Sequence, residues 1–115
     1  MGRGEMGTIT SSREIDAMFQ TASRADHPLV MALMTETPKD RDPQGRVAFI
    51  AGKRIGGAVV RNRARRVLRA AALRAGAPWP GHDVALLARA GTGTAPPGEL
   101  DRALQNVLRR LGVLS

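Results

Sequence analysis

The 115-residue chain contains no cysteine and only two histidines, His27 and His82. Disulfides and cysteine-based zinc sites are therefore excluded, and two isolated histidines do not predict an imidazole metal site. No apolar run approaches the roughly 20 residues that a membrane-spanning helix requires. The first ten residues also lack the apolar stretch of a signal peptide. We therefore expect a soluble, cytoplasmic protein that does not bind a membrane.

Recognisable catalytic motifs are absent as well. The sequence has no glycine-rich P-loop, no G-x-S-x-G and no H-E-x-x-H, and neither histidine has a nucleophile beside it. Most of the ten carboxylates fall at predicted helix starts or in loops, where caps and turns use them. The sequence therefore predicts no catalytic residue and no metal ligand in this chain, which disfavours an independent nuclease.

Aromatic residues are scarce: Phe19, Phe49 and Trp79 are the only three. We expect Phe49, in the middle of a predicted strand, to lie in the core, and we favour the core for Phe19 too. Trp79, between two prolines, allows either placement. With so few aromatic rings, stacking on bases cannot dominate any binding of nucleic acid, and phosphate contacts should dominate instead.

The remaining residues predict helices and strands within one domain. Apolar side chains recur at helical spacing in residues 11–22, 58–73 and 97–111. Short apolar runs predict strands at residues 29–35, 47–52 and 83–90. The order helix, strands, helix, strand, helix predicts an α/β fold, an α+β two-layer sandwich. Residues 1–10 are predicted to be a flexible arm, and residues 11–115 a single domain.

Residues that favour helix ends support these boundaries. Ser11 and Glu14 form the pattern of a capping box, in which each side chain satisfies a free backbone N–H. Gly76 and Gly112 follow the second and third predicted helices, where a glycine commonly ends a helix. The chain therefore carries stop signals after both of its longer helices.

Positive charge is concentrated in one segment. The net charge is +8 and the sequence pI is about 11.7. Residues 52–74 contain eight Lys or Arg and no Asp or Glu, whereas the other ten basic residues are matched by ten acidic ones. A local block of one sign attracts polyanions and raises their association rate. The segment therefore predicts binding to a nucleic acid.

The arginines of this segment fall on one side of the predicted helix. Arg61, Arg65 and Arg69 are spaced four residues apart and form one stripe. Asn62 and Arg66 lie next to it. Arginine suits phosphates because its planar fork donates two hydrogen bonds and keeps its charge. We therefore expect this side to face the nucleic acid.

The loop before the helix adds to this surface. Lys53 and Arg54 precede the glycine pair Gly56 and Gly57. A strand-to-helix turn explains the glycines, which would also let a phosphate backbone approach closely. The free N–H groups at a helix start favour a bound anion. This leaves two possible roles for the glycines.

The stretch KRIGGAVVRNRARRVLRAA, residues 53–71, resembles the signature segment of the bacterial ribonuclease P protein component. That signature has two basic residues, Ile or Val, Gly, a small stretch, Arg-Asn-Arg, a variable residue, two basic residues and an apolar-rich helix. An opening helix with an apolar-x-x-x-Phe pattern, the stretch HDVALLARAG and a closing amphipathic helix follow the family's order. The resemblance thus extends over residues 11–111.

The resemblance implies a protein subunit of a ribonucleoprotein that removes the 5′ leader from precursor tRNA. Its partners would be the ribonuclease P RNA and precursor tRNA, with no obligate protein partner. The catalytic groups would belong to the RNA, which would also hold most of the Mg²⁺. The implied fold has a left-handed β-α-β crossover, against the usual right-handed preference.

The resemblance also implies two sites. A cleft between the first helix and the sheet would hold the leader and would include Ile15 and Phe19. The catalytic RNA would contact Lys53, Arg54, Arg61, Asn62, Arg63, Arg65, Arg66 and Arg69.

This sequence departs from the family at the leader site. Ile15 stands where the family has the first aromatic residue of its opening helix, and the strand at residues 29–35 has no aromatic residue. We therefore expect leader binding to rely more on charge. Without the resemblance, the residues alone leave an alternative: a ribosomal or general nucleic-acid-binding protein with no processing role.

Overall fold

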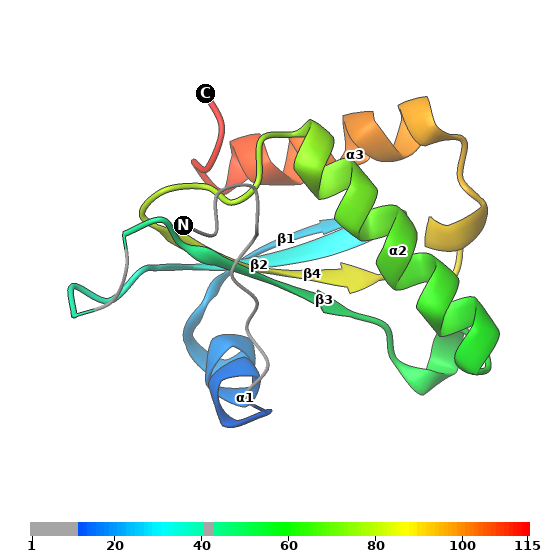
Figure 1. Ribbon diagram of the computed structural model, residues 1–115, viewed down its shortest axis with the longest axis horizontal. Helices are drawn as coiled ribbons and strands as arrows, with labels where there is room; N and C mark the ends of the chain where they lie inside the picture. The colour runs from blue at the N-terminus through cyan, green and yellow to red at the C-terminus, as the bar shows by residue number, and fades with distance from the viewer. Residues whose placement is uncertain (1–11, 41–42) are drawn as a thin grey trace, which may run out of the picture.

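The structure is a computed structural model that describes residues 12–40 and 43–115 (Figure 1). The predicted arm, residues 1–10, and Ser11 of the capping box lie outside the described residues. The elements are α1 (Ser12–Thr21), β1 (Ser23–His27), β2 (Val30–Glu36), β3 (Arg46–Ile50), the 3-10 turn η1 (Lys53–Ile55), α2 (Ala58–Arg74), β4 (His82–Ala88), the 3-10 turn η2 (Thr92–Thr94) and α3 (Pro97–Arg110).

The strands form one sheet with the order β1-β2-β4-β3. β1 pairs antiparallel with β2, and β2 pairs antiparallel with β4. β3 pairs parallel with β4, and α2 connects them. The predicted α/β class and element order are confirmed, and a β-α-β crossover joins β3 to β4.

Helices cover both faces of the sheet (Figure 1). α2 and α3 pack on one face around buried side chains that include Leu68, Leu104 and Leu86. On the other face, Met18 of α1 packs on Leu33 and on two small residues, Ala48 and Ala85. Side chains alternate between the faces along each strand, so β2, β3 and β4 contribute to both clusters, whereas β1 contributes Ala25 to the first alone. α2 and α3 with the sheet form a two-layer body, and α1 lies against its opposite side.

Both longer helices end in the way that their glycines predict. Gly76 and Gly112 have φ values of 98° and 79°, a left-handed conformation that favours glycine. After α2, the N–H of Ala77 donates to the carbonyl oxygen of Ala72 at 2.9 Å. After α3, Val113 N–H donates in the same way to a carbonyl of the last turn. These bonds are those of the Schellman motif.

The sequence pattern did not predict strand β1, because this strand lies at an edge of the sheet. It reads SRADH and forms the edge of the sheet, with Ala25 as its one buried residue. An edge strand with so little buried surface carries no apolar pattern. The polar residues after the opening helix therefore read as a connection rather than as a strand.

The favoured core position of Phe19 was wrong. The Phe19 side chain is 49% exposed, because Met18 and Ile15 occupy the side of α1 that faces the sheet. Phe49 packs against the main core, as predicted. Trp79, whose placement was open, is buried, and its Nε1–H donates to the Ala75 carbonyl at 3.2 Å. One aromatic ring of three is thus left at the surface.

Candidate nucleic-acid interface

Helix α2 separates an apolar side from a cationic side. Its buried residues are Ala64, Leu68, Ala71 and Ala72, which pack into the main core. Small alanines bring the helix close to its neighbours and fix its orientation. The predicted RNA-facing residues of α2 lie away from this core: Arg61 and Arg65 are half-buried, and Asn62, Arg63, Arg66 and Arg69 are exposed.

Most of this positive charge has no negative partner. Within residues 12–40 and 43–115, no carboxylate forms an ion pair with Lys53, Arg54, Arg61, Arg65, Arg66 or Arg69. Arg65 instead donates a hydrogen bond to Asn62 Oδ1, which orients its guanidinium. Uncompensated cations on one side of a helix attract an anion. The surface is therefore suited to a phosphate backbone.

The start of α2 strengthens this preference. Its first turn contains no acidic residue, and no side chain caps it at Gly57. A helix start carries a partial positive charge, so the nearby arginines interact unfavourably with it unless an anion is present. The free N–H groups at this helix start also favour a bound anion. Bound phosphate would thus relieve an unfavourable arrangement.

The structure also explains the glycine pair. Gly56 has φ 146°, and an added Cβ would lie 2.9 Å from the side chain of Val60. The turn therefore requires glycine there. At Gly57 an added Cβ would meet nothing within 4 Å, so the backbone borders open space. Lys53 and Arg54 lie in η1, directly before this turn, and the turn brings them to the start of α2 (Figure 1).

Two arginines of the basic segment also serve the fold. Arg63 Nε donates to the carbonyl oxygen of Gly93 at 2.8 Å and ties α2 to η2. Arg74 pairs with Asp101 of α3 at 2.8 Å. This hydrogen bond to the carboxylate raises the pKa of Arg74 above its ordinary value. The charge of Arg74 is therefore balanced by Asp101, and Arg63 has a structural contact besides any role in binding.

The predicted leader-cleft residues lie on the opposite face of the sheet from α2. Ile15 is half-buried against the smaller apolar cluster, and Phe19 is exposed on α1. A cavity of about 160 Å³ lies between α1 and the sheet. Its described lining consists of Glu14, Ala17, Met18, Thr21, Thr35, Pro38, Arg46 and Asp83, and does not include Ile15 or Phe19. The structure thus places the two predicted residues beside this cavity rather than in its wall.

An ion-pair network that the sequence did not predict lines this cavity. Arg46 Nη2 lies 2.6 Å from a Glu14 oxygen and 3.2 Å from an oxygen of the buried Asp83. Asp83 also accepts a hydrogen bond from Thr37 Oγ1 at 3.0 Å. The available signal was a carboxylate at the start of an apolar strand, whose partners lie far away in the sequence. The network ties α1 to the sheet.

Two further properties of the described residues bear on function. None of their helices has the length and apolar character needed to cross a membrane. No group of three or more His, Asp or Glu side chains among them could hold a metal ion.

A protein-family model described as "Ribonuclease P" matches residues 6–112. The ribonuclease P protein component of Dehalococcoides mccartyi (strain CBDB1) is 38% identical over 85 residues, which cover 74% of this chain and 69% of that protein. The corresponding protein of Syntrophomonas wolfei is 31% identical over 108 residues, covering 93% and 88%. The family model and the match to the Syntrophomonas protein extend over nearly the whole described fold.

Solved structures share the fold. The RNase P protein of Staphylococcus aureus superposes with a TM-score of 0.80 at 17% identity, covering 96% of this chain and 100% of that one. The RNase P protein of Thermotoga maritima gives a TM-score of 0.73 at 18% identity, covering 90% and 96%. At such low identity, the likeness extends to the architecture described above and not to individual side chains.

Proposed function

The chain belongs to the ribonuclease P protein family, and on that premise we propose that its two separate surfaces bind two different RNAs. As a member of this family it is a protein subunit of ribonuclease P, the ribonucleoprotein that processes the 5′ end of tRNA, and it works with a catalytic RNA subunit. The proposal concerns which residues meet the catalytic RNA, and whether precursor tRNA binds this chain directly.

The surface for the catalytic RNA is the cationic side of α2 together with η1. The observation that carries this assignment is the run of cations without a carboxylate partner in the described structure. Each arginine that contacts a phosphate releases counterions from the RNA, so affinity should fall as salt rises. The contact residues of this proposal are Lys53, Arg54, Arg61, Asn62, Arg63, Arg65, Arg66 and Arg69.

The surface for the 5′ leader of precursor tRNA is α1 with the neighbouring sheet face. Phe19 supports this assignment, because a half-exposed ring offers a stacking platform for an unpaired base. Ile15 lies on the same helix and adds apolar contact. A leader bound here and a catalytic RNA bound on α2 would lie on opposite sides of the sheet. The subunit would thus recognise both RNAs at once.

The subunit acts by binding rather than by supplying reactive groups. The described side chains include no carboxylate or histidine cluster suited to a metal ion, so we assign the Mg²⁺ of the reaction mainly to the RNA. Arginines that neutralise phosphates would lower the magnesium concentration needed to hold the two RNAs together. Contact with the leader would favour precursor over product. Residues 11–115 would form the single domain that does this.

The direct test is cleavage of a 5′-labelled precursor tRNA at low magnesium. The arms are the protein alone, the catalytic RNA of the same organism alone, and the two together. We expect cleavage at the mature 5′ end to be far faster when both are present. Cleavage by the protein alone would indicate an independent nuclease. No gain from the protein would favour the alternative, a general nucleic-acid-binding protein.

The leader surface has its own test in Phe19→Ala. We expect about tenfold weaker binding of precursor tRNA to the assembled enzyme, because stacking on an aromatic ring contributes roughly 1–3 kcal/mol per base. Binding of mature tRNA should not change. Leu73→Ala on α2 is the matched control, since Leu73 is 47% exposed and Phe19 49%. Equal effects of Phe19→Ala on precursor and mature tRNA would refute the leader assignment.

A further inference from the structure

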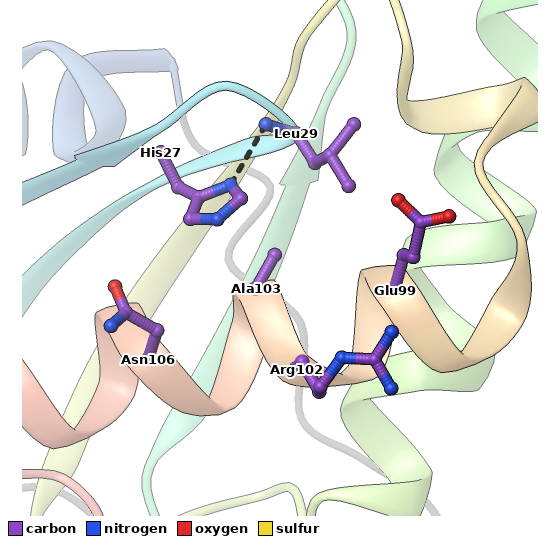
Figure 2. A pocket seen from close by; sticks show the side chains of 6 residues that line it. All are labelled: His27, Leu29, Glu99, Arg102, Ala103 and Asn106. Carbon is purple, nitrogen blue, oxygen red and sulfur yellow. Dashed lines mark hydrogen bonds between the residues drawn. The ribbon is translucent and has the colours of Figure 1, made fainter.

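A groove lies apart from both proposed surfaces, between the β1–β2 turn and α3 (Figure 2). Its volume is about 400 Å³, within the range of roughly 300–1,000 Å³ usual for ligand pockets. His27 and Leu29 face it from the turn, and four side chains rise from α3. The lining residues are His27, Leu29, Glu99, Arg102, Ala103 and Asn106.

Several side chains with hydrogen-bond donors line the groove. His27 Nδ1 accepts the N–H of Leu29 at 3.1 Å, so the neutral ring carries its proton on Nε2, which faces α3 (Figure 2). Asn106 Oδ1 accepts a hydrogen bond from Arg110 at 3.3 Å, which leaves the amide NH₂ as a donor. The Arg102 guanidinium makes no ion pair within the described residues. An occupant must therefore present several acceptors.

A carboxylate acceptor, Glu99, also lines the groove. Glu99 lies one turn before Arg102 on α3 and also makes no ion pair within the part of the chain that the structure describes. A carboxylate repels a bare phosphate, so the groove does not suit inorganic phosphate alone. The edges of guanine combine acceptors, O6 and N7, with N–H donors. Guanine could therefore pair its acceptors with Arg102 and its donors with Glu99.

A neighbouring hollow, which shares His27 with the groove and is bordered by arginines, suits the phosphate of the same nucleotide. Next to His27, Asp26 is surrounded by three arginines: Arg24 at 3.0 Å and Arg89 at 2.6 Å bind its carboxylate, and Arg110 donates to its carbonyl oxygen at 2.7 Å. The hydrogen bond from Arg24 holds the pKa of the Asp26 carboxyl below its ordinary value. Two guanidinium groups share the Asp26 carboxylate and a third binds its carbonyl oxygen, so this arginine rim is positively charged.

We propose that this groove binds one unpaired guanine nucleotide of an RNA strand, with the base between His27 and α3 and the phosphate at the arginine rim. Leu29 and Ala103 supply the apolar surface beneath the base. This inference goes beyond the proposed function and does not depend on which RNA α2 binds. It adds a sequence-reading contact to a subunit whose other proposed contacts are mainly with phosphates.

The first test is a titration of the ¹⁵N-labelled full chain with guanosine 5′-monophosphate, followed by NMR. We expect chemical-shift changes in residues 27–29 and 99–106. Half-saturation should need at least threefold less of this nucleotide than of adenosine or cytidine 5′-monophosphate. Equal changes with inorganic phosphate would refute recognition of the base. Changes confined to α2 would refute the groove itself.

Two substitutions separate the base contact from general charge. Glu99→Gln should reduce the preference for guanosine over adenosine monophosphate, and an unchanged preference would contradict the assignment. Arg102→Ala should weaken binding at least threefold. Arg109→Ala is the matched control, because Arg109 lies on the same helix, is exposed and does not line the groove. Equal losses in Arg102→Ala and Arg109→Ala would indicate charge alone.

A last comparison identifies the source of the nucleotide. Binding of the catalytic RNA and binding of precursor tRNA are measured separately with Arg102→Ala and Arg109→Ala. A loss specific to Arg102→Ala with one of the two RNAs supports the groove and names the strand. An Arg102→Ala protein that binds both RNAs like the unmodified chain would overturn the inference, even if the α2 assignment holds.

Discussion

Helices α2 and α3 pack on the same face of the sheet and bury similar apolar sides, yet they distribute charge in opposite ways. α3 has Glu99 in its first turn and Arg109 and Arg110 in its last, the arrangement that the helix dipole favours. α2 has no acidic residue in its first turn, and its cations begin at Arg61. The helix dipole thus stabilises the charges at the ends of α3. It disfavours the cations near the start of α2, which a bound anion would stabilise.

The largest effects on stability should come from the sides that the two helices share. Leu68→Ala on α2 and Leu104→Ala on α3 each remove a fully buried side chain. We expect each to lower the free energy of unfolding by about 3 kcal/mol, since such truncations leave a cavity in a packed core. Urea denaturation followed by circular dichroism measures this. A change below about 1 kcal/mol in either variant would show that the helices are not equivalent in packing.

A smaller effect on stability should distinguish an arginine of α2 that stabilises the fold from one that serves binding alone. Arg63→Ala removes the 2.8 Å bond to Gly93 and should cost about 1 kcal/mol of stability. Arg66→Ala is the matched control, because Arg66 is exposed and has no ion-pair partner within the described structure. Thermal denaturation of the two variants compares them. Identical midpoints would mean that Arg63 does not stabilise the contact with η2.

The smallest effect should come from the ion pair that joins the two helices. Asp101→Asn breaks the 2.8 Å link to Arg74, whose side chain is 48% exposed. Exposed pairs contribute roughly 0.2–1 kcal/mol, so we expect a loss of about 0.5 kcal/mol that shrinks in high salt. The same variant frees one cation on α2 and should slightly strengthen RNA binding. Weaker RNA binding would contradict the view that Asp101 balances the charge of Arg74.

The sequence predicted those parts of the fold that have strong local patterns. Both longer helices, their glycine stops and the buried strand β4 follow from apolar spacing and turn residues. Strand β1 could not be found in this way, because Ala25 is its one buried residue and its pairing with β2 is a tertiary contact. The prediction of a core position for Phe19 also failed. Residue spacing shows that a helix has an apolar side, but it does not show how far that side extends.

The sites, like the fold, could be predicted only where a local sequence pattern indicates them. The cationic side of α2 is visible in the sequence because helical geometry places Arg61, Arg65 and Arg69 together. The network of Glu14, Arg46 and Asp83 joins three elements that are distant in sequence. The groove under His27 likewise requires the β1–β2 turn and α3 to meet. Such sites depend on topology, which local patterns do not encode.

The most direct test of the contrast between α2 and α3 is the salt dependence of catalytic-RNA binding in Arg65→Ala, Arg69→Ala and Arg109→Ala. Each α2 variant should bind about tenfold more weakly, about 1.4 kcal/mol, and the slope of log affinity against log salt should fall by about one. Arg109→Ala should leave affinity and slope nearly unchanged. Equal losses in all three variants, or an unchanged slope in both α2 variants, would contradict the account.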